Sequence, residues 1–213
     1  MNSPVEPSGD VSANNPCPFL RAMVANGAID AHHEPLTHVS AVATTALDPP
    51  AKQRRDARTK VFLVGMIGNG LAPWTLVRNL LRGLRPDELR GGPLDKRGVG
   101  TRILDARGRV DLAELERFDS FAVDCRDPET GQVERGLRAA EIRTMMDTNF
   151  ARAAGSRRRV DRKLMDFEWP VLLNLMAKPG SDEPYLSVAE VRTLFLESRL
   201  PARVLDRLAS TQR

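Results

Sequence analysis

A short pattern that recurs three times constrains the fold of this 213-residue chain more than any other feature. In each copy an apolar residue is followed four positions later by a glutamate and then by another apolar residue. The copies are Val110-Asp111-Leu112-Ala113-Glu114-Leu115, Leu137-Arg138-Ala139-Ala140-Glu141-Ile142 and Leu186-Ser187-Val188-Ala189-Glu190-Val191. In the first and third copies Asp111 or Ser187 can cap a helix while the glutamate reaches back, as in a capping box. The pattern therefore predicts short extended stubs that lead into helices.

The same pattern forms the second half of an EF-hand loop, with the apolar residue at position 8 and the glutamate at position 12. Calcium also needs oxygen ligands at positions 1, 3 and 5 of such a loop. Before Glu114 these positions hold Ile103, Asp105 and Arg107, and the other two loops also lack the necessary carboxylates. We therefore expect a mainly α fold of EF-hand-like helix-loop-helix units with short β stubs, and we do not expect calcium to bind.

A different signal lies near the N-terminus, where one cysteine stands between two prolines in the run Asn15-Pro16-Cys17-Pro18-Phe19-Leu20, which continues to Asn26-Gly27. Proline fixes φ and restricts the residue before it, so Cys17 lies on a stiff kink before a short predicted helix that ends at Gly27. A helix N-terminus favours the thiolate, which is the form of cysteine that ligates metal. The alternative interpretation is a small apolar cysteine packed at a helix start.

This run resembles the proximal heme-ligand segment of heme-thiolate peroxidases and peroxygenases, the chloroperoxidase-like family. In that family the cysteine holds the heme iron, and its electron donation favours O–O cleavage. The resemblance implies that Cys17 binds heme as the axial ligand of the iron.

The chain from about 59 to 199 also resembles the caleosins, a family of EF-hand-derived heme peroxygenases. Four stretches carry the resemblance: Gly70–Thr75 with Arg78, the run from Lys96 to Arg109, Leu137–Asn149, and Asp166–Trp169 with Leu186–Phe195. The calcium ligands of the family fall here on Val64, Met66 and Gly68, and its heme-linked histidine falls on about Thr59. Because both families use heme and peroxide, we expect Cys17 to replace histidine as the axial ligand.

A heme peroxygenase also needs an acid–base group that moves a proton. His33 and Glu34 are the first candidates, because an adjacent carboxylate can orient an imidazole that titrates near neutral pH. Glu168, between Phe167 and Trp169, is the other candidate, since apolar surroundings raise the pKa of a carboxyl group. The alternatives are an exposed polar loop for the histidines and a core-edge glutamate with an arginine partner for Glu168.

The order of these segments predicts four parts. They are a disordered tail (1–15), a heme-ligand-like segment (16–47), a charged linker (48–60) that begins with Asp48-Pro49-Pro50, and a helical domain (61–213). The two cysteines lie far apart and no secretory signal is evident, which favours a reducing cytoplasm. The apolar hairpin of the caleosins is replaced by the short, charged stretch 79–90, so no integral membrane anchor is expected. The mild net charge of +4 does not indicate nucleic-acid binding.

The sequence thus predicts a soluble heme-thiolate peroxygenase or peroxidase. It would use hydrogen peroxide or an organic hydroperoxide to oxidise a small apolar molecule. The alternative is a non-catalytic, EF-hand-like interaction module that has lost both metal and heme. A third hypothesis is a redox-sensing thiol at Cys17 that works without a cofactor.

Overall fold

The computed structural model describes residues 11–92, 95, 103–105, 107–128 and 130–209. Within them the protein is mainly helical, with a small three-stranded antiparallel sheet. The predicted mainly α fold with short β stubs is confirmed to that extent. The chain forms two compact units, which we call the terminal unit (Met1–Asp95, Ala106–Gly108 and Leu196–Arg213) and the central unit (Lys96–Asp105 and Arg109–Phe195). Residues 1–10 of the predicted tail and residues 96–102 of the caleosin-like run lie outside the described residues.

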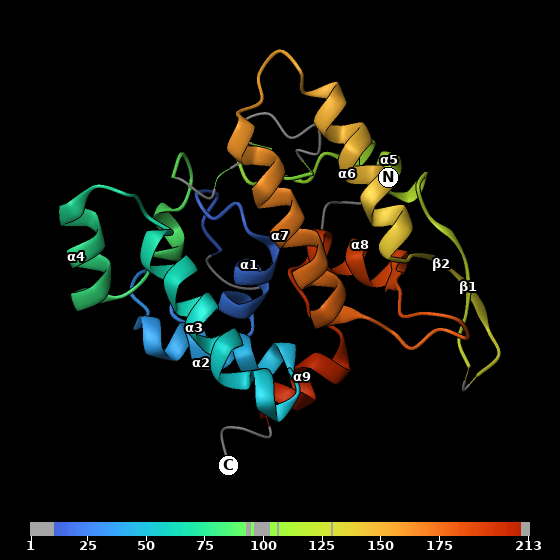
Figure 1. Ribbon diagram of the computed structural model, residues 1–213, viewed down its shortest axis with the longest axis horizontal. Helices are drawn as coiled ribbons and strands as arrows, with labels where there is room; N and C mark the ends of the chain where they lie inside the picture. Colours follow the sequence, from blue (N-terminus) through green and yellow to red (C-terminus); the bar gives the residue numbers. More distant parts are fainter. Residues whose placement is uncertain (1–10, 93–94, 96–102, 106, 129, 210–213) are drawn as a thin grey trace. The chain divides into compact units, whose positions relative to one another are not determined.

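The terminal unit is built from helices (Figure 1). They are α1 (Pro18–Ala25), α2 (Leu36–Leu47), α3 (Ala51–Ile67), α4 (Pro73–Arg82), the 3₁₀ turn η1 (Pro86–Glu88) and α9 (Ala202–Ala209). Helix α2 packs against α3 and α9, and α3 packs against α4. One apolar cluster joins α2 to the segment around η1 and consists of Leu36, Val39, Leu84 and Leu89, with Leu20, Phe62 and Met66 packed against them.

Two stretches of the terminal unit differ from the sequence prediction. The expected linker 48–60 is largely the first half of α3, because the run from Ala51 is rich in good helix formers and its charged side chains stay exposed. Asp48 adopts a left-handed conformation (φ 43°) that ends α2, so the break before α3 is only a few residues long. Residues 11–15 of the expected tail are also ordered, because the Arg21 guanidinium donates to the Ser12 carbonyl at 3.1 Å.

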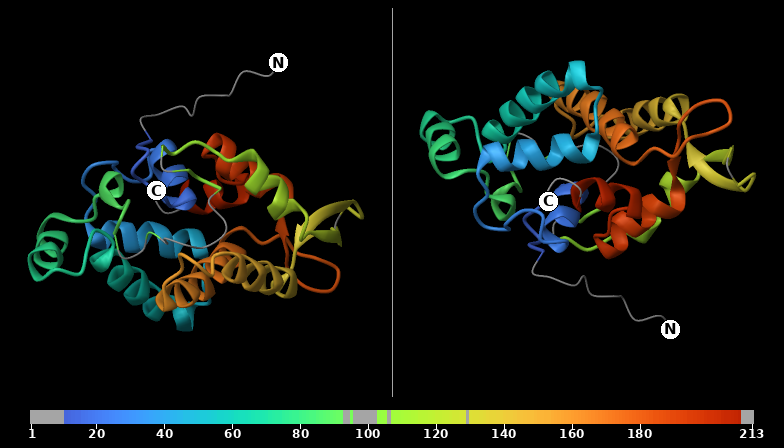
Figure 2. Two further views of the ribbon diagram at one scale, coloured as in Figure 1. Left: turned by 90° about the horizontal axis from the view of Figure 1, so that it is seen from above. Right: turned by 90° about the horizontal axis from the view of Figure 1, so that it is seen from below.

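The central unit contains the small sheet. Its elements are α5 (Leu112–Asp119), β1 (Val123–Arg126), β2 (Val133–Leu137), α6 (Ala139–Arg152), α7 (Arg159–Met176), β3 (Leu186–Ser187) and α8 (Val188–Glu197), the last of which ends within the terminal unit. The strand order is β1-β2-β3, with Val123 opposite Gly136 and Leu137 opposite Leu186. Figure 2 shows the β1–β2 hairpin at the edge of this unit. Each copy of the repeated pattern leads into a helix (α5, α6 or α8), as predicted.

A polar cluster holds the sheet of the central unit together. The Glu134 carboxylate on β2 accepts hydrogen bonds from Lys178 Nζ (2.6 Å), Tyr185 Oη (2.8 Å) and Ser187 Oγ (2.7 Å). Burial by itself would raise the pKa of Glu134, but these hydrogen bonds outweigh it and hold the pKa below the usual value of 4.5. Tyr185 is fully buried. The pKa of its phenol is raised, mainly by this burial and secondly by the hydrogen bond to Glu134.

Glu134→Ala is expected to destabilise the central unit by about 3 kcal/mol, because it leaves an ammonium and two hydroxyl groups without their acceptor. Chemical denaturation of the full chain measures the loss. Since the folded pKa of Glu134 is depressed, its contribution is present above pH 4.5 and is lost as the pH falls through the folded pKa. Asp124→Ala is the control: Asp124 pairs with Arg135 in an exposed contact, so a loss of no more than about 0.5 kcal/mol is expected. Equal losses in the two variants would contradict this account.

Among the described residues no helix is both long enough and apolar enough to cross a membrane.

Candidate functional site

Cys17 is the N-cap residue of α1, with extended backbone angles (φ −90°, ψ 113°). Pro18 begins the helix, where its missing N–H costs no hydrogen bond. The Asn15 side chain accepts a hydrogen bond from the Cys17 N–H at 3.1 Å, and the Cys17 carbonyl accepts one from Arg21 N–H at 3.0 Å. The thiol is half-buried and lies at the positive end of a helix dipole. A negatively charged sulfur is favoured at such a position.

The other end of α1 is fixed just as firmly. Gly27 adopts a left-handed conformation (φ 67°), and its N–H donates to the Val24 carbonyl at 2.9 Å. The Ala28 N–H donates to the Met23 carbonyl at 2.9 Å, which completes a Schellman motif. The predicted helix stop at Gly27 is thereby confirmed. Both ends of the helix that carries Cys17 are therefore determined by local backbone geometry.

Glu34 and His38 form a close pair in the same unit. Glu34 Oε1 lies 2.5 Å from His38 Nδ1, and Glu34 Oε2 accepts a hydrogen bond from the Asp30 N–H at 2.6 Å. The Glu34 side chain is only 8% exposed, whereas that of His38 is 50% exposed. The Glu34 backbone forms an isolated bridge with Leu84, which fixes the carboxylate against the segment before η1. A buried carboxylate thus orients a half-exposed imidazole.

This pairing differs from the local pair that the sequence suggests. His33 is exposed, and its Nδ1 contacts the carbonyl oxygen of the neighbouring His32 at 3.0 Å instead of the Glu34 carboxylate. Glu34 precedes α2, whose N-cap is Pro35, and His38 lies in the first turn of that helix, so the contact joins the residue before the helix to the helix itself. The spacing of four residues is visible in the sequence, but it does not by itself predict this contact, because Glu34 is not helical.

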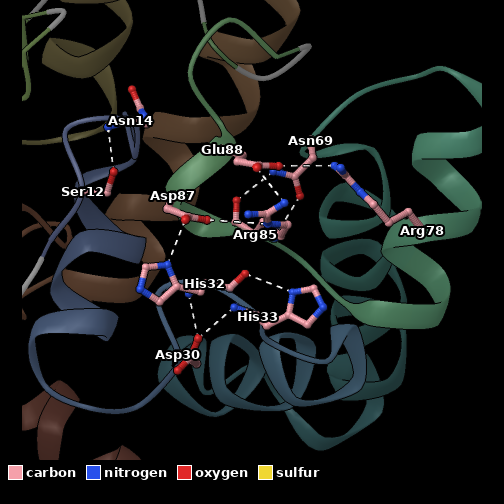
Figure 3. Close-up of polar contacts among 10 residues, drawn as sticks. All are labelled: Ser12, Asn14, Asp30, His32, His33, Asn69, Arg78, Arg85, Asp87 and Glu88. Carbon is pink, nitrogen blue, oxygen red and sulfur yellow. Dashed lines mark hydrogen bonds and ion pairs between the residues drawn. The ribbon is translucent and has the colours of Figure 1, made fainter.

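His32 belongs to a second group of polar contacts, which Figure 3 shows. Its Nδ1 lies 2.9 Å from Asp87 Oδ2 on η1, while the Asp30 carboxylate accepts the His32 and His33 N–H groups at 2.7 and 2.8 Å. The hydrogen bond from the His32 ring to the Asp87 carboxylate is the main reason that the pKa of His32 is raised above 6.5. The group connects the loop before α2 with η1.

Asp87→Asn is expected to lower the pKa of His32, because it removes the negative charge that stabilises the imidazolium. The raised pKa means that the pair stabilises the fold below pH 6.5 and that this contribution is lost as the pH rises through the folded pKa. NMR titration of the His32 ring protons measures the shift. Glu88→Gln is the control, since Glu88 contacts Arg85 and Arg78 instead of the histidine. An unchanged His32 pKa in Asp87→Asn would contradict the assignment.

Glu168 lies on α7 in the central unit and is half-buried. It precedes Trp169, whose buried ring stacks on Phe118 with the ring centroids 5.5 Å apart. Of the candidates from the sequence, Cys17, His33 and Glu34 belong to the terminal unit and Glu168 to the central unit.

Over the described part of the chain, no three histidine, cysteine, aspartate or glutamate side chains gather in a way that could hold a metal ion. Comparison of the chain with protein-family models, with curated proteins and with solved structures finds no significant match in any of the three.

Proposed function

We propose that this protein is a heme-thiolate peroxidase or peroxygenase in which the Cys17 thiolate would hold the heme iron. The observation that carries the proposal is the position of Cys17 as the half-buried N-cap of α1, held by Asn15 on one side and by the helix on the other. A cysteine thiolate is one of the ligands that heme iron takes in proteins, so the donor fits the group. When bound, a thiolate-ligated heme supplies peroxide-dependent oxidation, here of a small apolar molecule.

Glu34 and His38 supply the proton transfer in this proposal. The neutral imidazole donates its Nδ1 proton to Glu34 Oε1, which leaves Nε2 as the nitrogen that accepts and returns a proton. The buried carboxylate fixes the orientation of the ring. Glu34 thus keeps the role that the sequence predicts, and His38 takes the place of His33 as the imidazole. Glu168 stays a prediction as the second acid.

Peroxide-dependent turnover of the heme-loaded protein tests this assignment. Glu34→Gln and His38→Gln are expected to keep the heme absorbance and to lower turnover by about 10²-fold or more, the usual effect of losing an acid–base group. His32→Gln is the control, because its ring contacts Asp87 and lies outside the pair. If His33→Gln lowers turnover and His38→Gln does not, the acid–base role belongs to His33 and the proposed pair is wrong.

For the central unit we propose an EF-hand-like pair of helix-loop-helix units. In them an arginine or lysine side chain lies near the glutamate at loop position 12, where an EF-hand would bind calcium. Leu137 and Leu186, both at loop position 8 by the sequence pattern, are paired across β2 and β3. Glu114 at position 12 lies 2.5 Å from Arg152 Nη2, and Glu190 lies 4.0 Å from Lys178 Nζ. Adding calcium is accordingly expected to leave the thermal unfolding temperature unchanged, and a calcium-dependent rise would contradict this.

The same observations favour the non-catalytic interaction module as the second candidate function. In this scaffold Arg152 and Lys178 supply the positive charge opposite Glu114 and Glu190, so a metal ion is not required at these glutamates. Heme titration separates the two candidates, since stoichiometric uptake supports the enzyme and the absence of uptake supports the module.

A further inference from the structure

Helix α4 is amphipathic, but its apolar side is turned outward. Thr75 and Asn79 are the buried residues of this helix, with exposed fractions of 9% and 0%. Most of its large apolar side chains are instead exposed, with Trp74 at 76% and Leu81 at 77%, whereas Leu76 is half-buried. The exposed ones together form the outward face of α4: Trp74, Val77, Leu80 and Leu81. A surface helix ordinarily buries its apolar side, so this arrangement is the reverse of the usual one.

Polar contacts hold α4 in this orientation. The Asn79 side chain donates a hydrogen bond from Nδ2 to the Met66 carbonyl near the end of α3 at 2.9 Å. Thr75 packs against Gly70, where a Cβ atom would lie only 3.1 Å from the threonine methyl group. Turning the helix to bury the apolar side would break the Asn79 bond and move Thr75 out of this contact. The exposed apolar face is thus a fixed feature of the terminal unit.

The stretch of chain that forms α3 and α4 is strongly positive. Between Ala51 and Arg82 there are seven lysine or arginine residues and a single acid, Asp56, which gives a net charge of +6 against +4 for the whole chain. Two of these cations are on α4 itself: Arg78, which also pairs with Glu88 at 3.5 Å, and Arg82 in the last turn. Leu71, 62% exposed in the turn before the helix, extends the apolar surface.

We propose that α4 and Leu71 dock on an anionic membrane surface, with the apolar face in the lipid interface. A helix with tryptophan and leucine on one side and arginine on its flanks is typical of interfacial binding, and anionic headgroups attract the surrounding cations. A second copy of the chain is a poor occupant of this face, because it would bring two positively charged surfaces together. The proposal is independent of heme binding and of Cys17.

Co-sedimentation of the full-length protein with phosphatidylcholine vesicles, with and without phosphatidylserine, tests the proposal. We expect binding only when phosphatidylserine is present, weakening as the salt concentration rises. Leu81→Glu is expected to lower the partition coefficient at least tenfold. The matched control is Leu112→Glu, which places the same charge at an exposed leucine on α5 and is expected to leave binding unchanged.

Tryptophan fluorescence gives a second readout, because Trp74 is exposed whereas Trp169 is buried. A blue shift on adding the anionic vesicles is expected in the wild type and is expected to be lost in Trp74→Phe. The proposal is overturned if the protein binds neither kind of vesicle or binds both equally. The same conclusion follows if Leu81→Glu and Leu112→Glu have the same partition coefficient. It is also overturned in favour of self-association if Leu81→Glu dissociates an oligomer in the absence of vesicles.

Discussion

Cys17→Ala is expected to abolish the spectrum of thiolate-ligated heme in the reconstituted protein, because the substitution removes the sulfur proposed to bind the iron. Helix α1 should form in the variant, since its Schellman motif at Gly27 and the N–H bond from Cys17 to Asn15 do not involve the thiol. The measurement is the absorbance of the reduced protein under carbon monoxide, in which a thiolate ligand gives a strongly red-shifted Soret band.

The other cysteine provides the control. Cys125 on β1 is buried, and burial raises the pKa of its thiol and so disfavours the thiolate. Cys125→Ala is therefore expected to keep the red-shifted band. Circular dichroism of both variants separates loss of the ligand from loss of the fold. A band that persists in a folded Cys17→Ala protein would show that another residue holds the iron.

Gly83→Ala is expected to destabilise the terminal unit by about 3 kcal/mol or more and to disturb the Glu34–His38 pair. Gly83 ends α4 with φ 93°, and a Cβ atom there would lie 2.2 Å from the backbone oxygen of Glu34. Backbone atoms cannot move aside as a side-chain end can, so the strain of the left-handed conformation is added to a steric clash. The bridge between Glu34 and Leu84 would have to open. Chemical denaturation measures the loss of stability.

A second glycine separates strain from steric clash. Gly91 has a similar positive φ of 76°, but no atom of the residues that the structure describes lies within 4 Å of the position of an added Cβ. Gly91→Ala is expected to cost about 1 kcal/mol, which is the strain of the left-handed conformation alone. If the two substitutions cost the same, the close approach of Gly83 to Glu34 does not contribute to stability.

Local signals in the sequence predicted the features that depend on neighbouring residues. The Asp111 carboxylate accepts the Ala113 and Glu114 N–H groups, as its capping position suggested, and Gly27 ends α1. The Ser187 hydroxyl also donates to Glu134, which is 53 residues away, and the capping pattern gives no sign of this partner. Glu114 likewise pairs with the distant Arg152. A capping pattern contains no information on such long-range partners.

The candidate site was predictable only in part for the same reason. The stiff kink at Cys17 follows from the two prolines, whereas the contact between His32 and Asp87 depends on how η1 packs against the loop before α2. The burial of Glu34 depends on its bridge with Leu84, 50 residues further along the chain. Periodicity shows that α4 has an apolar side, but the outward direction of that side depends on the bond between Asn79 and Met66.

The absorbance spectrum of the wild-type protein, titrated with heme, reduced and exposed to carbon monoxide, tests the central claim most directly. Stoichiometric uptake and a strongly red-shifted Soret band are the predicted results, because they report a thiolate on the iron. Uptake with a Soret band at the position typical of histidine ligation would contradict the role of Cys17. Absence of stoichiometric uptake would contradict the enzyme proposal as a whole and would favour the interaction module.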